Sequence, residues 1–232
     1  MAWGIAEVVE KTLLDFLTSI DTPTVCNLIE IVAPERRGIG YTVKHLHCPF
    51  PELPPMVGFA KTAAIRAKDA VALGNYMQRR LDYLDYVAAQ PRPSIVVIED
   101  LDGEQAGYGA FWGEVQTNVH QALGCLGTIT NGSVRDIPMI PHGFQMLAGS
   151  ISPSHAYVHI TDFGNGVTVA GMTVKSGDLI HADCHGAVVV PKDKIADMIP
   201  ALDDLQRRET AIINAARAPD MTVEKIKAAI RG

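Results

Sequence analysis

The chain has 232 residues, of which 47% are hydrophobic, enough to form the core of one large domain or two small ones. Its 20 Lys and Arg residues are outnumbered by 26 Asp and Glu residues, so the formal net charge is -6. This balance argues against a protein that binds nucleic-acid phosphates through a basic surface. No segment approaches the roughly 18 consecutive apolar residues of a membrane span, so we expect neither nucleic acid nor a membrane as a partner.

The amino-terminal segment and the cysteines both predict a cytoplasmic location. MAWGIAEVVEKTLLDF has acidic residues inside an apolar pattern and no cationic start, which indicates an amphipathic helix rather than a signal peptide. The cysteines form no CxxC pair, which fits a reducing compartment better than a disulfide framework. No activating partner is evident for a catalytic cysteine. The four cysteines are Cys26, Cys48, Cys125 and Cys184.

The first quarter of the chain predicts two helices followed by an irregular excursion. Apolar residues recur at helical spacing within residues 4–33, and Asp-Thr-Pro at 21–23 indicates a stop and a new capped start. Residues 34–56 are rich in proline and glycine, so we expect them to form a long irregular segment. A connection of that length inside a compact domain is usually functional or an insertion.

The middle of the chain predicts a parallel crossover unit. VGFAKTAAIRA at 57–67 indicates a strand, residues 75–89 a helix, and SIVVIED at 94–100 a buried strand. Residues 113–123 indicate a second helix, which stops at Gly124. Parallel strands require such helical crossovers, so part of the sheet should be parallel.

The remaining elements complete the predicted fold. From 155 to 190, short apolar runs alternate with Gly, Asn and Asp, which predicts antiparallel strands and turns. Residues 193–231 predict two helices broken near Pro219. Because we find no internal repeat or linker, we predict a single α/β domain over residues 1–232, with a mixed sheet that has helices on its faces.

A first candidate site lies in GCLGTITNGSVRDIP, residues 124–138. It predicts a short strand, a turn at Asn131 and Gly132, and then Arg135 beside Asp136. A guanidinium binds a carboxylate or carbonyl with paired hydrogen bonds, and a carboxylate holds a hard cation. At the end of a parallel strand, the pair suits an anionic oxo acid bound with a divalent metal. A surface salt bridge or a capping aspartate explains the same spacing.

A second candidate is the start of the helix in WGEVQTNVHQALG. Gly113 and Glu114 open this helix, and the free backbone N–H groups of Val115 and Gln116 could hold an anion. The helix dipole also favours Glu114 at this position, so a structural role is equally open.

A third candidate is Glu209, in the middle of the apolar stripe of the helix that begins near residue 193. We expect its carboxylate to lie off the solvent face. Since an unpaired buried charge is costly, Glu209 should meet an arginine, a metal shell or a subunit interface. The stripe consists of Ile195, Met198, Leu202, Leu205 and Ile212.

Two other polar groups are weaker candidates. EDLDGE at 99–104 lacks the spacing of a calcium loop and favours an acidic turn. The segment HADCH at 181–185 holds zinc-ligand residue types, His181, Asp183, Cys184 and His185. Strand alternation would send Cys184 to the face opposite the other three, which argues against zinc.

The pattern GxxGxxxNGxxRD at 124–136, with the upstream WGE and the downstream SGDLIHADCHGAVVVP, resembles the RraA-like family, which includes the 4-hydroxy-4-methyl-2-oxoglutarate aldolases. The resemblance extends from DTPTV at residue 21 to the helix of Glu209. It implies an α/β/α sandwich with a mixed sheet, of the swivelling-domain type. It also implies homotrimers or dimers of trimers, with active sites between subunits.

The resemblance implies roles for the candidate residues. Asp136 would ligate Mg²⁺ or Mn²⁺ directly, whereas Glu114 and a neighbouring subunit's Glu209 would hold metal-bound water. The groups that would bind the pyruvyl end of the substrate are Arg135, Gly113 and the backbone N–H groups of Val115 and Gln116.

The implied activity is that of a class II pyruvate aldolase, which cleaves a 4-hydroxy-2-oxo acid to pyruvate and a second carbonyl product. Oxaloacetate decarboxylation would be a side activity, because it passes through the same enolate. One alternative is the family branch that restrains a ribonuclease without catalysis, but that branch tends to lack the equivalents of Asp136 and Glu209. Another is a different metal-dependent lyase or hydratase at the same site. Methyl transfer is disfavoured because the chain lacks a glycine-rich loop for S-adenosylmethionine.

This sequence departs from the family pattern in two places. Asn131 stands where the family often has Asp, and the 34–56 excursion is longer than usual. Both departures bear on the part of the substrate beyond the pyruvyl half.

Overall fold

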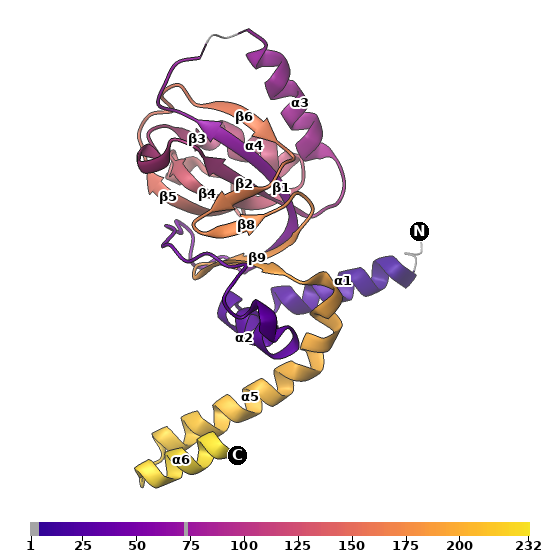
Figure 1. The fold of residues 1–232 in the computed structure, drawn as a ribbon, viewed down its shortest axis with the longest axis vertical. Coiled ribbons are helices and arrows are strands. Elements are labelled where there is room, and N and C mark those ends of the chain that lie inside the picture. Colours follow the sequence, from indigo (N-terminus) through magenta and orange to yellow (C-terminus); the bar gives the residue numbers. More distant parts are fainter. Residues whose placement is uncertain (1–4, 72–73) are drawn as a thin grey trace.

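In a computed structural model of the chain, residues 5–71 and 74–232 are described, with side chains in the first helix from residue 11 onward. Residue 4, the start of the predicted helical region 4–33, lies outside the described residues. The predicted mixed α/β class with a mixed central sheet is confirmed (Figure 1). The helices are α1 (Ile5–Thr18), α2 (Thr22–Val32), α3 (Tyr76–Ala88), α4 (Glu114–Ala122), α5 (Ile195–Arg217) and α6 (Val223–Arg231).

An eight-stranded sheet forms the centre of the molecule. Its strands are β1 (Met56–Arg66), β2 (Ser94–Asp100), β3 (Ala110–Trp112), β4 (Cys125–Val134), β5 (Gln145–Ile151), β6 (His159–Phe163), β9 (Leu179–Asp183) and β10 (Gly186–Val190), and β7 (Val167–Val169) pairs with β8 (Met172–Val174) in a separate ribbon. The order is β10-β9-β1-β2-β4-β3, with β5 paired to β4 and β6 to β1. The pairs among β1 to β5 are parallel, whereas β6, β9 and β10 pair antiparallel. The sequence did not predict β3 or β5.

The two faces of the sheet carry different covers, because side chains alternate along each strand. On β2, Val96 and Ile98 join the core under α3 and α4, which also contains Tyr83. Ile95 and Val97 point the other way, into a core shared with the β7–β8 ribbon. The helices therefore lie over one face, and a strand ribbon closes the other.

The 34–56 segment follows an irregular path, as its prolines predict. It crosses the face under the β7–β8 ribbon, where Leu46 enters the same core. Isolated bridges hold it at Tyr41, opposite Val188 of β10, and at His47, opposite Ala148 of β5. These two single bridges, to strands at opposite ends of the sheet order, hold the segment in place although it forms no strand of its own.

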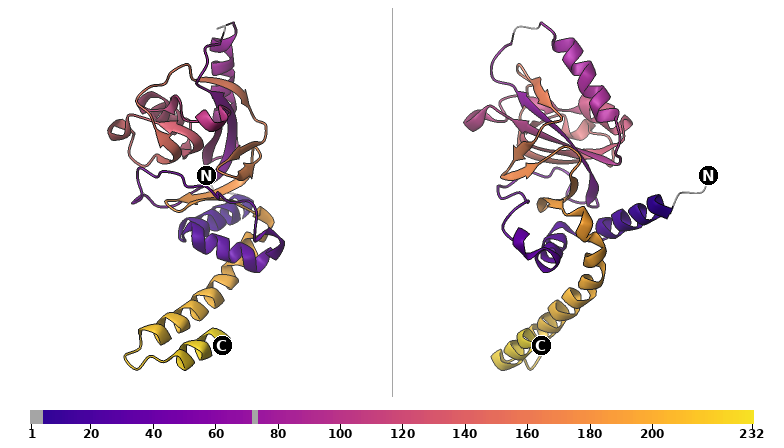
Figure 2. Two further views of the ribbon diagram at one scale, coloured as in Figure 1. Left: turned by 60° about the vertical axis from the view of Figure 1, so that its left-hand side comes forward. Right: turned by 45° about the vertical axis from the view of Figure 1, so that its right-hand side comes forward.

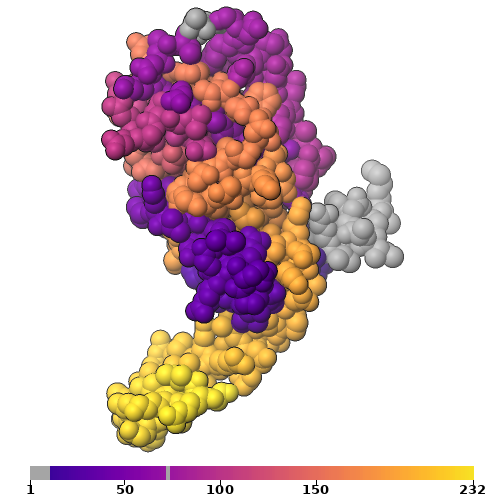
Figure 3. Space-filling view, viewed as in Figure 1, coloured from indigo at the N-terminus to yellow at the C-terminus, as the bar shows by residue number. Residues whose placement is uncertain are grey.

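The amino- and carboxy-terminal helices meet at the β9–β10 end of the sheet. Asp21 caps α2 by accepting a hydrogen bond from the Thr24 N–H at 2.8 Å, which confirms the predicted stop and start at 21–23. Leu28 of α2 and Met198 of α5 share a core with Val188. Beyond this contact, α5 and α6 project away from the sheet in every view (Figures 2 and 3). Within the described residues, no helix combines the length and apolar character that a membrane span needs.

The predicted turn at Asn131 and Gly132 is wrong, because β4 continues through both residues to Val134. The Asn131 side chain takes the place of a strand partner: its Oδ1 accepts from the Asp100 N–H at 2.8 Å, and its Nδ2 donates to the Asp100 carbonyl at 2.9 Å. The register with β5 shifts between Thr130 and Ser133. The Asn-Gly pair therefore makes an irregularity inside a long strand.

A buried histidine joins α4 to α3. The Nδ1–H of His120 donates to the Gln116 carbonyl at 2.6 Å, which leaves Nε2 to accept from the Tyr83 hydroxyl at 2.9 Å. The His120 ring also packs edge-on against Trp112, with 4.6 Å between ring centroids. Burial lowers the pKa of His120 from 6.5 to about 4.

We predict that acidification destabilises the fold through His120. Below pH 6.5 the unfolded chain binds a proton at His120, whereas the folded chain does not until the pH nears 4. The free energy of unfolding therefore decreases as the pH is lowered, and this group accounts for a decrease of about 2 kcal/mol at pH 5. Urea unfolding of the wild type and of His120→Gln between pH 7 and 5 measures this term. The slope against pH should be smaller in the variant, and the exposed His142→Gln should keep the wild-type slope. Equal slopes in all three proteins would contradict the assignment.

Candidate functional site

Arg135 and Asp136 follow directly after β4, as predicted. The Arg135 N–H donates to the Trp112 carbonyl at 2.9 Å, which ties the end of β4 to the end of β3. Asp136 has φ 55° and ψ 31°, a left-handed conformation that few residues other than glycine adopt. The Arg135 Nε lies 3.7 Å from the Asp136 Oδ2, and their side chains are 35% and 37% exposed. This pair is therefore open to a ligand.

Gly113 brings the start of α4 against this pair. A Cβ at Gly113 would lie 2.7 Å from the Asp136 Oδ2 and 3.1 Å from the Arg135 Cγ. No other residue type leaves room for both side chains where they are. The N–H of the next residue, Glu114, lies 3.3 Å from the same Asp136 oxygen.

The amino end of α4 has backbone donors to spare. The first intrahelical bond runs from the Thr117 N–H to the Gly113 carbonyl, at 3.0 Å. The N–H groups of Val115 and Gln116 have no acceptor among the described residues. Two N–H groups at the positive end of a helix, beside a guanidinium, form a site for a carboxylate or an oxo group.

These groups border a cleft of about 520 Å³. Four predicted residues line it, namely Gly113, Val115, Gln116 and Arg135. Sequence reasoning missed further lining residues, among them Tyr76, Arg80, His155, Tyr157 and His159. Tyr76 and Arg80 are four apart on α3 and so share a helix face, but only the packing of α3 shows which face meets the cleft.

The residues present fit a hard divalent cation. The Asp136 carboxylate is partly exposed, and the Glu114 side chain is exposed, with no hydrogen-bond partner among the described residues. Two accessible carboxylates supply the oxygen donors that Mg²⁺ or Mn²⁺ accepts, and such ions keep several waters. Oxygen ligands and water are sufficient for such an ion, so the site requires neither a cysteine nor a histidine.

Glu209 does not join this group within one chain. It lies on α5, is exposed, and its Oε1 is 3.5 Å from the Asn27 amide nitrogen. The expectation that its carboxylate lies off the solvent face is therefore wrong for the single chain. Leu205 still packs against the amino-terminal core, but further along α5 Ile213 is 44% exposed, because the helix has left the sheet behind.

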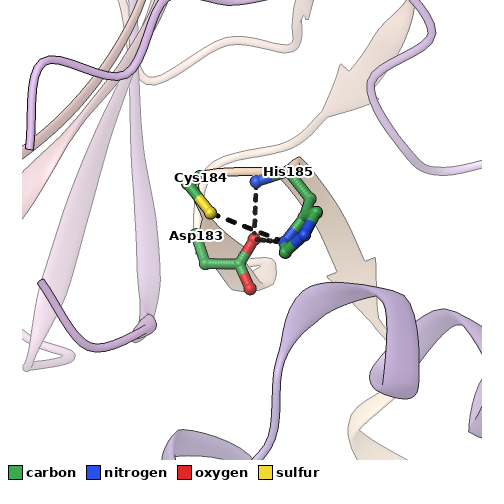
Figure 4. Close-up of side chains that lie close together, drawn as sticks. All are labelled: Asp183, Cys184 and His185. Atoms are coloured by element: carbon green, nitrogen blue, oxygen red, sulfur yellow. Dashed lines mark hydrogen bonds and ion pairs between the residues drawn. The ribbon is translucent and has the colours of Figure 1, made fainter. Parts of the chain in front are cut away.

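The HADCH segment separates into a structural histidine and a small cluster at the β9–β10 turn. His181 is buried, and its Nε2 donates to the Leu17 and Ile20 carbonyls, both at 3.0 Å. At the turn, the His185 Nδ1 lies 3.1 Å from the Asp183 Oδ1 and 3.6 Å from the Cys184 Sγ (Figure 4). The prediction that Cys184 lies on the opposite face from its neighbours is therefore wrong, because β9 ends at Asp183 and side chains no longer alternate beyond it.

Asp183 has a structural task in this cluster. It accepts hydrogen bonds from the backbone N–H groups of Thr22 and His185, both at 2.8 Å. Burial opposes the charge, but these donors hold the pKa of Asp183 below its usual value. The carboxylate thereby ties the β9–β10 turn to the start of α2.

The EDLDGE carboxylates also bind backbone N–H groups. Asp102 accepts from Ala67 at 2.7 Å and from Lys68 at 2.9 Å, and Asp100 accepts from Gly107 at 2.8 Å. These bonds support the interpretation of an acidic turn.

Comparison with known proteins identifies the family. The family model described as "RraA-like: Aldolase/RraA" matches residues 22–189. The chain belongs to the RraA-like family. Its match includes every site residue named above except Glu209, which lies beyond the matched segment.

Individual relatives are distant. A Halalkalibacterium halodurans protein named "Putative 4-hydroxy-4-methyl-2-oxoglutarate aldolase" is 25% identical over 226 residues, 92% of this chain and 96% of the relative. Protein DlpA of Legionella pneumophila is 25% identical over 165 residues, 68% of this chain but only 23% of DlpA. The crystal structure of Streptomyces coelicolor RraAS2, described as an unusual member of the RNase ES inhibitor RraA protein family, has a TM-score of 0.67 at 20% identity. The match covers 86% of this chain and 94% of that one. Since this identity is low, the likeness shows the fold alone.

We predict that Gly113→Ala keeps the fold but displaces the Asp136 carboxylate. The new Cβ would overlap the end of a flexible side chain, which can swing away at little cost in stability. A crystal structure of the variant should show the Asp136 Oδ2 moved from the Glu114 N–H, with the free energy of unfolding within about 1 kcal/mol of wild type. Gly38→Ala is the control, since a Cβ there meets nothing within 4 Å. An unmoved carboxylate in Gly113→Ala would contradict the prediction.

Proposed function

We propose that the chain is a divalent-metal-dependent lyase of the class II pyruvate aldolase type, which cleaves a 4-hydroxy-2-oxo acid to pyruvate and a second carbonyl product. The observation that carries the proposal is the convergence of Arg135, Asp136 and the free N–H groups of α4 around Gly113. Membership of a family that is described as Aldolase/RraA supports it.

Substrate binding would use the donors around Gly113. The Arg135 guanidinium and the N–H groups of Val115 and Gln116 would bind the carboxylate and the C2 oxo oxygen. Donors aimed at the oxo oxygen are the ones that stabilise the charge which develops there. The backbone N–H bond from Arg135 to Trp112 fixes the point from which this side chain extends.

Asp136 would hold Mg²⁺ or Mn²⁺, with Glu114 beside it. When bound, the ion would supply a Lewis acid that polarises the C2 carbonyl. Glu114 and a neighbouring subunit's Glu209 would orient a water that takes the C4 hydroxyl proton. As the C3–C4 bond breaks, its electrons pass into the oxo-acid half as an enolate, whose charge Arg135 offsets. Protonation at C3 releases pyruvate.

The same enolate forms when oxaloacetate loses carbon dioxide. Oxaloacetate decarboxylation is therefore part of the proposal as a side activity. A hydratase or another lyase reaction through the same enolate would use the same residues, and only the products distinguish these reactions.

A homotrimer or a dimer of trimers would explain the position of Glu209. The carboxylate is exposed on a helix that projects from the sheet, where a second copy could receive it (Figure 2). Small molecules and copies of this chain are thus the partners that we propose.

The second candidate function is restraint of a ribonuclease by a non-catalytic protein. Its support is the family description, which names RraA beside the aldolases. The presence of Asp136 and Glu209 favours catalysis.

We predict pyruvate release from 4-hydroxy-4-methyl-2-oxoglutarate and from oxaloacetate with Mg²⁺ or Mn²⁺, and none with EDTA. Arg135→Ala should reduce kcat by about 10²- to 10³-fold, the cost of losing one oxyanion donor. Asp136→Ala should abolish release. A coupled lactate dehydrogenase assay measures all three proteins.

Two results would oppose this assignment. Wild-type turnover in Arg135→Ala would remove the proposed role of the guanidinium. Absence of release from both substrates with every metal, together with tight binding to a ribonuclease in a pull-down, would favour the second candidate.

We further predict that sites form between subunits. Asp136→Ala and Glu209→Ala should each be inactive, whereas oligomers reassembled from an equal mixture should regain up to about a quarter of wild-type activity, because that fraction of sites joins two intact halves. The measurement is the pyruvate assay after joint refolding. Separately refolded variants, mixed only in the cuvette, are the control. If the reassembled oligomers have the size of the wild-type oligomer but regain no activity, a shared site is contradicted.

A further inference from the structure

Two arginines line the cleft, although the chain is acidic overall. Arg80 and Arg135 lie there with His155 and His159, and no Asp or Glu is among its described lining residues. The whole chain has a formal net charge of -6. A concave surface with charge of one sign concentrates ligands of the opposite sign. The cleft therefore offers a second cation for an anion, Arg80, beyond the groups around Gly113.

Arg80 is the cation in this lining that has no partner. Its side chain is half-buried on α3, and it makes no hydrogen bond or ion pair with any residue that the structure describes. Its neighbour Arg79 is exposed and donates to the Thr161 carbonyl, outside the cleft lining. A half-buried guanidinium without an acceptor has donors that only a ligand or water can satisfy.

The two histidines also keep a nitrogen free. The His155 Nδ1 lies 2.7 Å from the Ala156 carbonyl, and the His159 Nδ1 lies 2.8 Å from the Tyr157 carbonyl. Because a carbonyl oxygen only accepts, both rings carry their proton on Nδ1. Each Nε2 is then an acceptor, and no described residue donates to it.

We propose that Arg80 binds a second carboxylate of the substrate, at the end remote from the 2-oxo acid group, and so determines specificity for dicarboxylic oxo acids. This inference rests on the proposed function, in which Arg135 and the start of α4 hold the pyruvyl end. The cleft, at about 520 Å³, has the size of sites for ligands larger than a three-carbon acid. A single guanidinium matches a carboxylate in charge and in the geometry of its paired donors.

Binding of two matched ligands tests this role. 2-Oxoglutarate and 2-oxopentanoate have the same number of carbons and differ in the terminal carboxylate, and neither carries a C4 hydroxyl for retro-aldol cleavage. Calorimetry with the intact oligomer and Mg²⁺ should show tighter binding of 2-oxoglutarate by the wild type. In Arg80→Gln, the affinity for 2-oxoglutarate should fall about tenfold, while that for 2-oxopentanoate stays within about twofold. Arg79→Gln, on the same helix, should change neither.

The outcomes separate this inference from the proposed function. If 2-oxopentanoate binds in a manner that depends on Arg135 but Arg80→Gln leaves 2-oxoglutarate binding intact, the role of Arg80 is wrong and the pyruvyl site stands. An equal loss for both ligands in Arg80→Gln also overturns the role, because it indicates a general effect on the cleft. If the wild type binds neither ligand, both the pyruvyl site and the role of Arg80 are overturned.

Discussion

The close approach of two backbone segments at Gly113 is the constraint on which the site depends. The Trp112 carbonyl accepts the Arg135 N–H, so the ends of β3 and β4 lie side by side. A side chain at 113 would overlap the Asp136 carboxylate. Only because this position is empty can a guanidinium, a carboxylate and the amino end of α4 share one small volume. The ends of β3 and β4 thus hold these polar groups beside one another.

The layers of the fold explain why this volume is a cleft. Helices α3 and α4 cover one face of the sheet, and the buried His120–Tyr83 hydrogen bond holds them to each other. The loop from 155 to 159 closes the space between α3 and the start of α4, where the Ala110 N–H donates to the Ser154 carbonyl. Two arginines from elements that are distant in the sequence, Arg80 of α3 and Arg135 after β4, line this cleft. A negative chain thereby acquires a local site for anions.

Only the first part of the long helix α5 packs against the amino-terminal core. Leu205 packs against this core and Glu209 lies 3.5 Å from Asn27 of α2, whereas Ile213, further along α5, is 44% exposed. The outer part of α5 projects past the body (Figure 3). Exposed apolar side chains such as Ile213, on a helix that has left its own core, are suited to contact with another copy of the chain. The proposed active site and the proposed assembly are therefore linked, since the exposed Glu209 of one copy would complete the site of its neighbour.

The sequence by itself determined the helices and most strands, because apolar periodicity and capping residues such as Asp21 are local signals. It also determined that Arg135 and Asp136 follow a strand. Local signals were misleading at Asn131, where an Asn-Gly pair continues a strand because its side chain binds Asp100 across the sheet. Tertiary structure alone decided that Arg80 and His159 share a cleft with Arg135, and that Glu209 is exposed. These facts depend on which elements pack together. Packing between segments that are distant in the sequence produces no periodic pattern of residues from which it could be predicted.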